Sequence, residues 1–162
     1  MNMRVTAIKL TDEVLMRTAC DFTRDPNAEP SKMTLDRMYQ CEHSPMRTQL
    51  FWIEMHQIPT FVSVHLVRHN VGVTHFVQSK RDQLADRNTP INHAMLINAQ
   101  ELVNMSRKRL CKKSADETRH VWKTVKNEIA KIDYALAERM VADCIYRGKC
   151  HELNSCMGIS YE

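Results

Sequence analysis

The sequence predicts an α+β fold, with a small antiparallel or mixed sheet formed early in the chain and helices flanking it later. Residues 3–10 and 50–58 are short runs rich in β-branched and bulky apolar residues, which is typical of strands. From Pro90 onward, apolar residues recur at helical spacing nearly to the end of the chain. The length of 162 residues suits one domain, which we expect to span residues 1–162.

The region that follows the first strand predicts two short helices joined by a loop. Asp12 stands where a helix cap is expected, and the helix it begins covers residues 13–22. Residues 23–31 are polar and contain two prolines, which predicts a loop. We expect a second helix over 31–41, capped by Ser31.

The middle of the chain contains the strongest strand signal. Residues 50–58 carry bulky residues on both faces, which favours a central strand that ends at Pro59. Residues 60–69 are apolar on most sides and fit either a strand or a buried helix, of which we favour the helix. Residues 70–83 are then expected to continue as extended chain.

Three helices are expected in the second half, over residues 91–111, 116–132 and 133–144. On the first of them, Asn98 and Arg109 are eleven residues apart, which is about three helical turns and places both on one face. Such a pair can line a site, or it can be the polar edge of an apolar core stripe.

The composition narrows the classes of function. The net charge of +4 and the pI near 8.8 are compatible with anionic ligands, but they fall well short of a nucleic-acid-binding tail. No stretch reaches the length of a membrane span, and the first residues lack an apolar signal core. We therefore expect a cytoplasmic protein that binds neither nucleic acid nor membrane.

Cysteine and glycine usage excludes several common sites. Because no export signal is present, reduced thiols are the default for the six cysteines. Zinc is the alternative for one cluster, although its spacing is not that of a zinc motif, and we expect no metal site. The three glycines form neither a phosphate-binding loop nor a dinucleotide motif. The cluster consists of Cys144, Cys150, His151 and Cys156.

Residues 66–83 mix cationic and polar side chains with apolar ones. A solvated basic run would not need the apolar residues, and a core strand would not tolerate the charges. The mixture therefore predicts charged groups fixed by a buried backbone, which is how an anion site is built. No pairing typical of a side-chain nucleophile and its base is visible. The polar residues in question are Arg68, His69, Ser79 and Arg81.

Several separate motifs resemble those of the flavin-dependent thymidylate synthases, and together they span most of the chain. The family signature of an Arg-His-Arg triplet followed by Ser-x-Arg is matched by Arg68, His69, Ser79 and Arg81. The segment "EHSP" at 42–45 resembles the histidine turn before the family's central strand. A family helix pattern is matched by Asn98, Leu102, Asn104 and Arg109, and the cysteine-rich end is also similar.

The chain departs from the family pattern at identifiable places. Asn70 and Gln100 stand where the family has arginines that it uses for FAD. Eight residues rather than seven separate Asn70 from Ser79, and the segment between Arg81 and Pro90 is short.

The resemblance implies reductive methylation of dUMP to dTMP, with FAD as cofactor and with NAD(P)H and methylenetetrahydrofolate as co-substrates. It implies a homotetramer with sites between subunits, and it gives Arg109 the catalytic role of stabilising charge on the uracil ring. The dUMP-binding residues that it implies are His65, Arg68, Ser79, Lys80, Arg81, Arg87 and Arg109. The residues that it implies for FAD are His43, Pro45, Arg68, His69, Asn70, Asn98, Gln100 and Asn104.

Two alternatives remain beside this interpretation. One is a relative that keeps the pyrimidine deoxynucleotide site but modifies C5 without flavin-dependent reduction, which Asn70 and Gln100 favour. The other is a basic binding module without enzymatic activity. The sparse alternation of aromatic and basic residues argues against the second of these.

Overall fold

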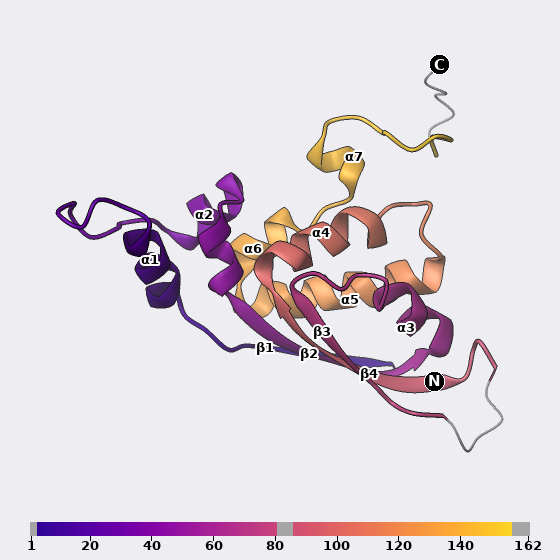
Figure 1. Ribbon diagram of the computed structural model, residues 1–162. Helices are drawn as coiled ribbons and strands as arrows, with labels where there is room; N and C mark the ends of the chain where they lie inside the picture. Colours follow the sequence, from indigo (N-terminus) through magenta and orange to yellow (C-terminus); the bar gives the residue numbers. More distant parts are fainter. Residues whose placement is uncertain (1–2, 81–85, 157–162) are drawn as a thin grey trace.

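The computed structural model describes residues 3–80 and 86–156, and its framework is a four-stranded antiparallel sheet (Figure 1). The strand order is β1-β2-β4-β3, so β2 and β4 are the inner strands. A bulge interrupts the pairing of β2 with β4 between Met55 and Ile58. The strands are β1 (Arg4–Lys9), β2 (Leu50–Pro59), β3 (Val73–Val77) and β4 (Pro90–Asn98).

The helices gather on one side of this sheet, and α4 and α5 lie over it in Figure 1. The pair α1 and α2 extends beyond the end of β1, whereas α3 covers the opposite end of the sheet. The helices are α1 (Glu13–Phe22), α2 (Leu35–Cys41), the 3-10 helix η1 (Ser44–Thr48), α3 (Thr60–Leu66), α4 (Ala99–Arg109), α5 (Asp116–Ile132), α6 (Tyr134–Arg139) and α7 (Asp143–Tyr146).

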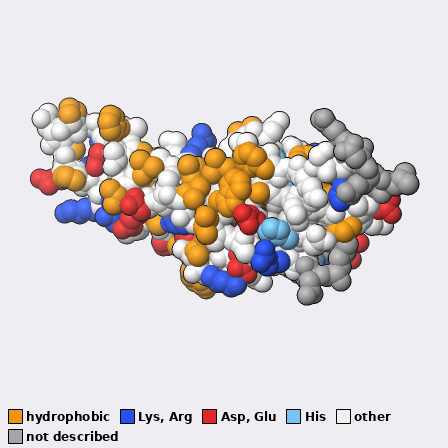
Figure 2. Space-filling model, turned by 90° about the horizontal axis from the view of Figure 1, so that it is seen from below, with side chains coloured by type: hydrophobic (Ala, Val, Ile, Leu, Met, Phe, Trp, Pro, Cys, Tyr) orange, Lys and Arg blue, Asp and Glu red, His pale blue; other side chains and the backbone are white. Residues whose placement is uncertain are grey.

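The core lies between the sheet and the helices. Along β2 and β4 every second residue is buried, which is the period of a strand with one face in the core. The opposite face carries Ile8 and Phe76, which are 54% and 50% exposed, and Trp52, whose ring centroid is 5.3 Å from that of Phe76. Figure 2 shows apolar side chains gathered on this face of the molecule. The sheet therefore has one filled face and one apolar face that helices do not cover.

A buried ionic network ties the strands to the helices. Asp133, between α5 and α6, accepts hydrogen bonds from Lys9 Nζ at 2.6 Å and Tyr39 Oη at 2.8 Å. Its other oxygen accepts from the backbone N of Leu136 at 3.1 Å and caps α6. Burial and the Asp133 charge raise the pKa of Tyr39, so its hydroxyl remains a donor. This single carboxylate thus connects β1, α2 and α6.

Most of the elements predicted before residue 90 are confirmed. Helix α1 begins after Asp12, whose side chain accepts from the backbone N of Leu15. Strand β2 is an inner strand, α3 is a helix, and β3 lies within the expected extended segment. The cap of the second helix is different, because Thr34 rather than Ser31 accepts the capping bond and α2 begins at Leu35.

The prediction of one helix over 91–111 is wrong in its first half. Residues 90–98 form β4, and the helix α4 begins only at Ala99. The alternating residues 91, 93, 95 and 97 are buried, and they satisfy the strand period as well as the helix period over this short length. The last strand of the sheet therefore comes late in the sequence. Its pairing with β2 and β3 decides between the strand period and the helix period. The expected helix over 133–144 is likewise divided into α6 and the start of α7.

Candidate active site

The end of α3 brings together basic side chains from three separate segments. His65 lies in the last turn of α3, and Arg68 follows two residues after that helix. Arg87 precedes β4, and Arg109 is the last residue of α4. Partial burial, and then the charges of Arg109, Arg68 and Arg87, lower the pKa of His65 below its usual range. We call His65 and these three arginines the arginine cluster.

Arg109 is anchored within this cluster. Its Nη2 donates to the backbone carbonyl of His65, one of the carbonyls that the end of α3 leaves without a helical partner. Its Nε is buried and has no hydrogen-bond partner among the described residues. Burial, and then the charge of Arg68, lower the pKa of Arg109. An arginine guanidinium nevertheless stays protonated at neutral pH, so Arg109 adds a positive charge to the cluster.

Aromatic and polar contacts fix the remaining members. The guanidinium of Arg87 lies 4.8 Å from the centroid of the Phe61 ring, and the Phe61 backbone N donates to the Arg87 carbonyl at 3.0 Å. The His65 ring stands edge-to-face against Phe61, with centroids 5.6 Å apart. Its Nδ1 is hydrogen-bonded to Thr118 Oγ1 at 2.9 Å. The His65 ring is therefore oriented from two sides.

The arginine cluster has no internal counter-ion. Within residues 3–80 and 86–156, none of its three guanidinium groups forms an ion pair. Arg109 is half-buried whereas Arg68 and Arg87 are exposed, and like charges held close together repel one another unless an anion offsets them. The arrangement therefore fits an anionic ligand with groups that accept bidentate hydrogen bonds.

A second set of polar side chains lies along α4, and its members bond to one another. Gln100 Nε2 donates to Glu42 Oε2 at 3.1 Å, and Arg107 forms an ion pair with the other oxygen of Glu42. Arg107 also lies over the Tyr146 ring, with its Cζ 3.7 Å from the centroid. We call the set made of Glu42, His69, Gln100, Glu101, Asn104 and Arg107 the α4 network.

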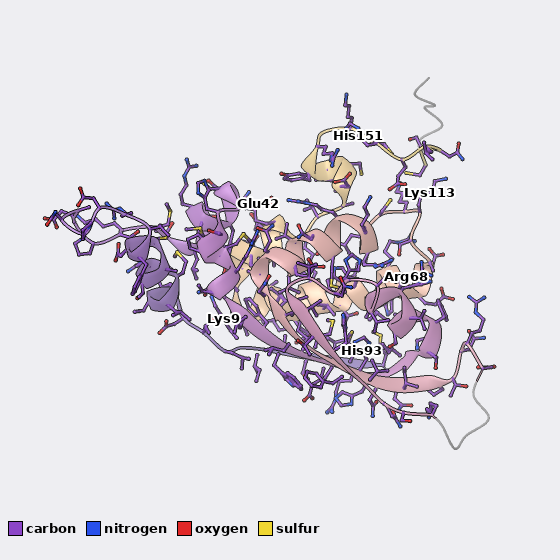
Figure 3. The ribbon with its side chains drawn as sticks, viewed as in Figure 1. Lys9, Glu42, Arg68, His93, Lys113 and His151 are labelled. Carbon is purple, nitrogen blue, oxygen red and sulfur yellow. The ribbon has the colours of Figure 1, made fainter. Side chains whose placement is uncertain are left out.

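Glu101 holds the other end of the α4 network. This residue is only 6% exposed. Its Oε1 is 3.1 Å from His69 Nδ1, and its Oε2 accepts from Asn104 Nδ2 at 3.2 Å. Figure 3 shows Glu42 and Arg68 well separated along the length of α4. The network thus runs from α2 to the residue next to the arginine cluster.

Asn98 has a local structural role that corrects the sequence interpretation. It is not a mid-helix residue on the face of Arg109, because it ends β4 and caps α4, with its Oδ1 accepting from the Glu101 backbone N at 2.9 Å. Its own backbone N donates to the Gly72 carbonyl at 2.9 Å. Gly72 has a φ of +77°, and a Cβ there would lie 2.6 Å from Asn98 Nδ2.

The other predicted cofactor residues are more dispersed. His43 and Pro45, at the start of η1, line a cavity of ≈ 750 Å³ between α1 and α2. Asn70 is exposed in the loop before β3. The cavity lined by His43 and Pro45 is also bordered by three cationic side chains and by no carboxylate of the described residues. The three are Arg24, Lys32 and Arg37.

Of the predicted phosphate-binding residues after β3, Ser79 and Lys80 are described, and Lys80 lies away from the arginine cluster. Lys80 lines a cavity of ≈ 320 Å³ together with Ser63, Val64 and Val67, which lie on another flank of α3 than His65. Ser79 is exposed and lies two residues after the end of β3. Arg81, predicted for the same role, lies outside the described residues.

The sequence interpretation missed the carboxylates of the α4 network. Asn98 followed three residues later by a glutamate is a helix-capping signal, and it could have placed both a helix start and a buried Glu101. Glu42 is part of the "EHSP" motif but received no role. The described residues contain no group of three metal-ligating side chains, and all six cysteines are free thiols. No helix in the described part of the chain could cross a membrane.

Comparison with known proteins gives no match to a protein-family model and none to a curated protein by sequence. Solved structures do match. Thymidylate synthase ThyX from Helicobacter pylori with FAD and dUMP has a TM-score of 0.68 at 12% identity, over 86% of this chain and 99% of that chain. A second structure of that enzyme with FAD and dUMP has a TM-score of 0.69 at 12% identity, over 85% and 99%.

A third structural match is the UMP/dUMP methylase PolB from Streptomyces cacaoi bound with 5-Br dUMP. It has a TM-score of 0.63 at 12% identity, over 87% of this chain and 97% of that chain. The sheet and the helices on one of its faces thus define an α+β protein of the kind that these three structures share. More narrowly, the fold is that of the flavin-dependent thymidylate synthases, as the sequence motifs predicted.

Proposed function

We propose that this protein binds dUMP at the arginine cluster and modifies C5 of the uracil ring, as a flavin-dependent thymidylate synthase that produces dTMP. One observation carries the proposal. Four residues predicted for the nucleotide converge from three separate segments, and the three arginines among them form no ion pair within residues 3–80 and 86–156. The matched structures, which hold dUMP or its 5-bromo derivative, support the choice of a pyrimidine nucleotide as the anion.

Arg109 would carry the charge stabilisation that the reaction needs. Uracil C5 is a poor nucleophile unless negative charge builds up at N3 and O2 of the ring. A guanidinium already held in place stabilises that charge without having to reorganise during the reaction. Arg109 fits this role because the His65 carbonyl anchors one Nη atom, while its Nε has no partner among the described residues.

The phosphate would be bound by the more accessible cations. Arg68 is exposed beside His65, and Arg87 is held at the edge of the cluster by Phe61. A planar guanidinium suits bidentate binding of phosphate oxygens. Ser79, Lys80 and Arg81 are the further donors that the sequence motif provides.

The residues fit FAD in part. His69, Gln100 and Asn104 would offer donors and acceptors to the polar edge of a flavin ring, and the cations beside His43 and Pro45 border a cavity that could take an anionic portion. Within the α4 network, however, the one arginine is already paired with Glu42. FAD, when bound and reduced by NAD(P)H, supplies a hydride, and methylenetetrahydrofolate supplies the carbon.

A second candidate function is modification of the pyrimidine C5 without flavin-dependent reduction. The observation that favours it is the bonding of two amides in the α4 network, in which Gln100 and Asn104 bond to each other and to carboxylates. Amides engaged in this way offer less to a diphosphate than the arginines that the family has at such positions.

We further propose that the enzyme is a homotetramer with sites shared between subunits. Lys80 lies on another flank of α3 than the arginine cluster of its own chain, so we propose that a neighbouring subunit supplies the nucleotide residues after β3. The apolar sheet face with Ile8, Trp52 and Phe76 offers a surface that association would cover. Closed symmetry then repeats each shared site identically.

Purified protein tests the function directly. Absorption bands of oxidised flavin, together with dUMP binding and dTMP formation, would support the first candidate. Colourless protein that binds dUMP would support the second. Protein that binds no dUMP by calorimetry, with uridine as the control ligand, would contradict both.

Assembly is tested by mass and by complementation. Light scattering should give a mass of about four chains. A refolded mixture of Arg109→Ala and Arg81→Ala should regain activity in about a quarter of the sites, if each site takes these residues from different chains. Arg68→Ala mixed with Arg109→Ala is the matched control, and it should regain none because both arginines belong to one cluster. A monomeric mass would exclude the tetramer.

A further inference from the structure

Three polar side chains that no predicted site includes form a continuous hydrogen-bond chain that ends at the backbone carbonyl of His69, next to the arginine cluster. Ser63 Oγ lies 2.9 Å from His93 Nδ1, and His93 Nε2 lies 2.9 Å from His75 Nδ1. His75 Nε2 lies 2.7 Å from the backbone carbonyl oxygen of His69. The chain therefore passes from α3 through β4 and β3 and returns to the loop that follows α3. Figure 3 shows His93 on the sheet below the region of Arg68.

The hydrogen-bond chain has only one direction when both rings are neutral. A carbonyl oxygen only accepts, so the proton of His75 must be on Nε2, which leaves Nδ1 as an acceptor. His93 must then donate from Nε2, and its Nδ1 must accept from the Ser63 hydroxyl. Burial, together with the His75 charge, lowers the pKa of His93 to about 4, which keeps that ring neutral at pH 7.

Burial decides what the hydrogen-bond chain can do. Ser63 is 3% exposed and His93 is 1% exposed, so a serine nucleophile activated by histidine is excluded. What remains is the carbonyl of His69, which is the only end of the chain that belongs to the predicted site. His69 is flanked by Arg68 and also bonds Glu101, and its backbone N donates to Leu66 at 3.0 Å.

We propose that Ser63, His93 and His75 are positioning residues of the nucleotide site, whose one-directional hydrogen-bond chain fixes the His69 carbonyl and thereby the place of Arg68. Without a donor at His75, the carbonyl loses its partner and the loop after α3 can rotate. Arg68 has no ion pair within the described residues that would hold it in its place. The effect on the ligand rests on the proposed function, whereas the hydrogen-bond direction does not.

The direction is measured first, on the intact protein without ligand. Long-range ¹H–¹⁵N spectra at pH 7 should show the Nε2–H tautomer for both His75 and His93. Ser63→Ala should leave His75 as Nε2–H and broaden or split the His93 signals, since His93 Nδ1 loses its donor. An Nδ1–H tautomer on either ring in the wild type would overturn the proposal.

Nucleotide binding then separates positioning from plain stability. His75→Phe should weaken dUMP binding by about tenfold, the effect of one lost hydrogen bond to the loop. His75→Gln, which keeps a donor near the position of Nε2, should stay within about threefold of the wild type. Equal affinities in folded wild type, His75→Phe and His75→Gln would overturn the proposal. Failure of the wild type to bind dUMP would reject the proposed function. The histidine tautomers alone would then confirm or overturn the direction of the hydrogen-bond chain.

Discussion

The arginine cluster and the α4 network meet at Arg68 and His69, yet they handle charge in opposite ways. In the cluster, three guanidinium groups surround His65 without a carboxylate partner among the described residues. In the network, Glu42 and Glu101 are both bonded to neighbouring side chains. Like charges held close together repel one another unless an anion offsets them, whereas the two carboxylates of the network already have partners. The difference indicates that the arginine cluster, rather than the α4 network, is the half of the site suited to an anion.

The largest expected effect removes the anchored member of the cluster. Arg109→Ala should reduce turnover about 100-fold or more, the size found for the loss of one electrostatic stabiliser. Arg109→Lys should restore it only in part, because a point charge does not reproduce a planar fork. Steady-state kinetics would measure this, with the neighbouring exposed Lys108→Ala as the control. Near-normal turnover in Arg109→Ala would remove this residue from the mechanism.

The corresponding change in the α4 network should act on stability instead. Glu101→Ala leaves His69 and Asn104 without their shared acceptor, so we expect a loss of about 2 kcal/mol in the free energy of unfolding. Urea denaturation measures it, and Glu13→Ala, at an exposed ion pair, should change it by about 0.5 kcal/mol or less. If folded Glu101→Ala lost turnover as strongly as Arg109→Ala, the two regions would not be distinct.

A substitution between the two regions tests how they are joined. Gly72→Ala places a Cβ 2.6 Å from Asn98 Nδ2 at a backbone φ of +77°. The side chain of Asn98 must move, and the cap of α4 weakens. We expect a loss of about 1–2 kcal/mol from the two effects together, measured by thermal unfolding. Gly148→Ala is the control, because its φ is also positive but nothing lies within 4 Å of the new Cβ. Equal losses in both variants would mean that only the φ angle matters.

A charge added to the α4 network should open it to an anionic cofactor. Gln100→Arg combined with Asn70→Arg restores the two family arginines, and it should tighten FAD binding at least about tenfold, since each adds a charged donor. Fluorescence titration of FAD would measure the change. Unaltered affinity in the double variant would show that FAD is bound elsewhere, or not at all, and would favour the second candidate function.

The smallest expected effect is a shift in the titration of His65. Its pKa in the free protein is below the usual 6.5 because of burial and the three arginine charges. A bound phosphate offsets those charges, so the pKa should rise and binding should take up protons on the acid side of neutrality. The dUMP affinity should therefore strengthen as pH falls through this window, after correction for the phosphate's own titration. An NMR titration of the His65 ring with and without dUMP measures it, and an unchanged midpoint would place the phosphate away from this ring.

Local sequence features predicted much of the fold because each element needed only its own neighbours. Asp12 caps α1, and the bulky residues of β2 are those of an inner strand. Residues 90–98 show the limit, since their apolar spacing fits two periods and pairing with distant strands decides between them. The helix prediction there was wrong for this reason.

For the site, the sequence motifs named four of the residues that meet at the end of α3. They could not show that Lys80 faces another flank of that helix, because this depends on how the hairpin folds back. They also missed Glu101 and the pair His75 and His93, since a buried polar residue differs from an exposed one only through its tertiary partners.

The bond from Arg109 to the His65 carbonyl has a consequence for the thermodynamics of recognition. An arginine side chain loses up to about 2 kcal/mol of rotamer freedom when it is ordered, and here folding has already taken most of that loss. The Arg68 side chain is exposed, so more of its rotamer freedom is left to be lost when a ligand binds. In the proposed complex, recognition of the ring would therefore be rigid and entropically inexpensive, whereas recognition of the phosphate would carry more of the ordering cost. A ligand with an altered base should lose more affinity than one with an altered phosphate end.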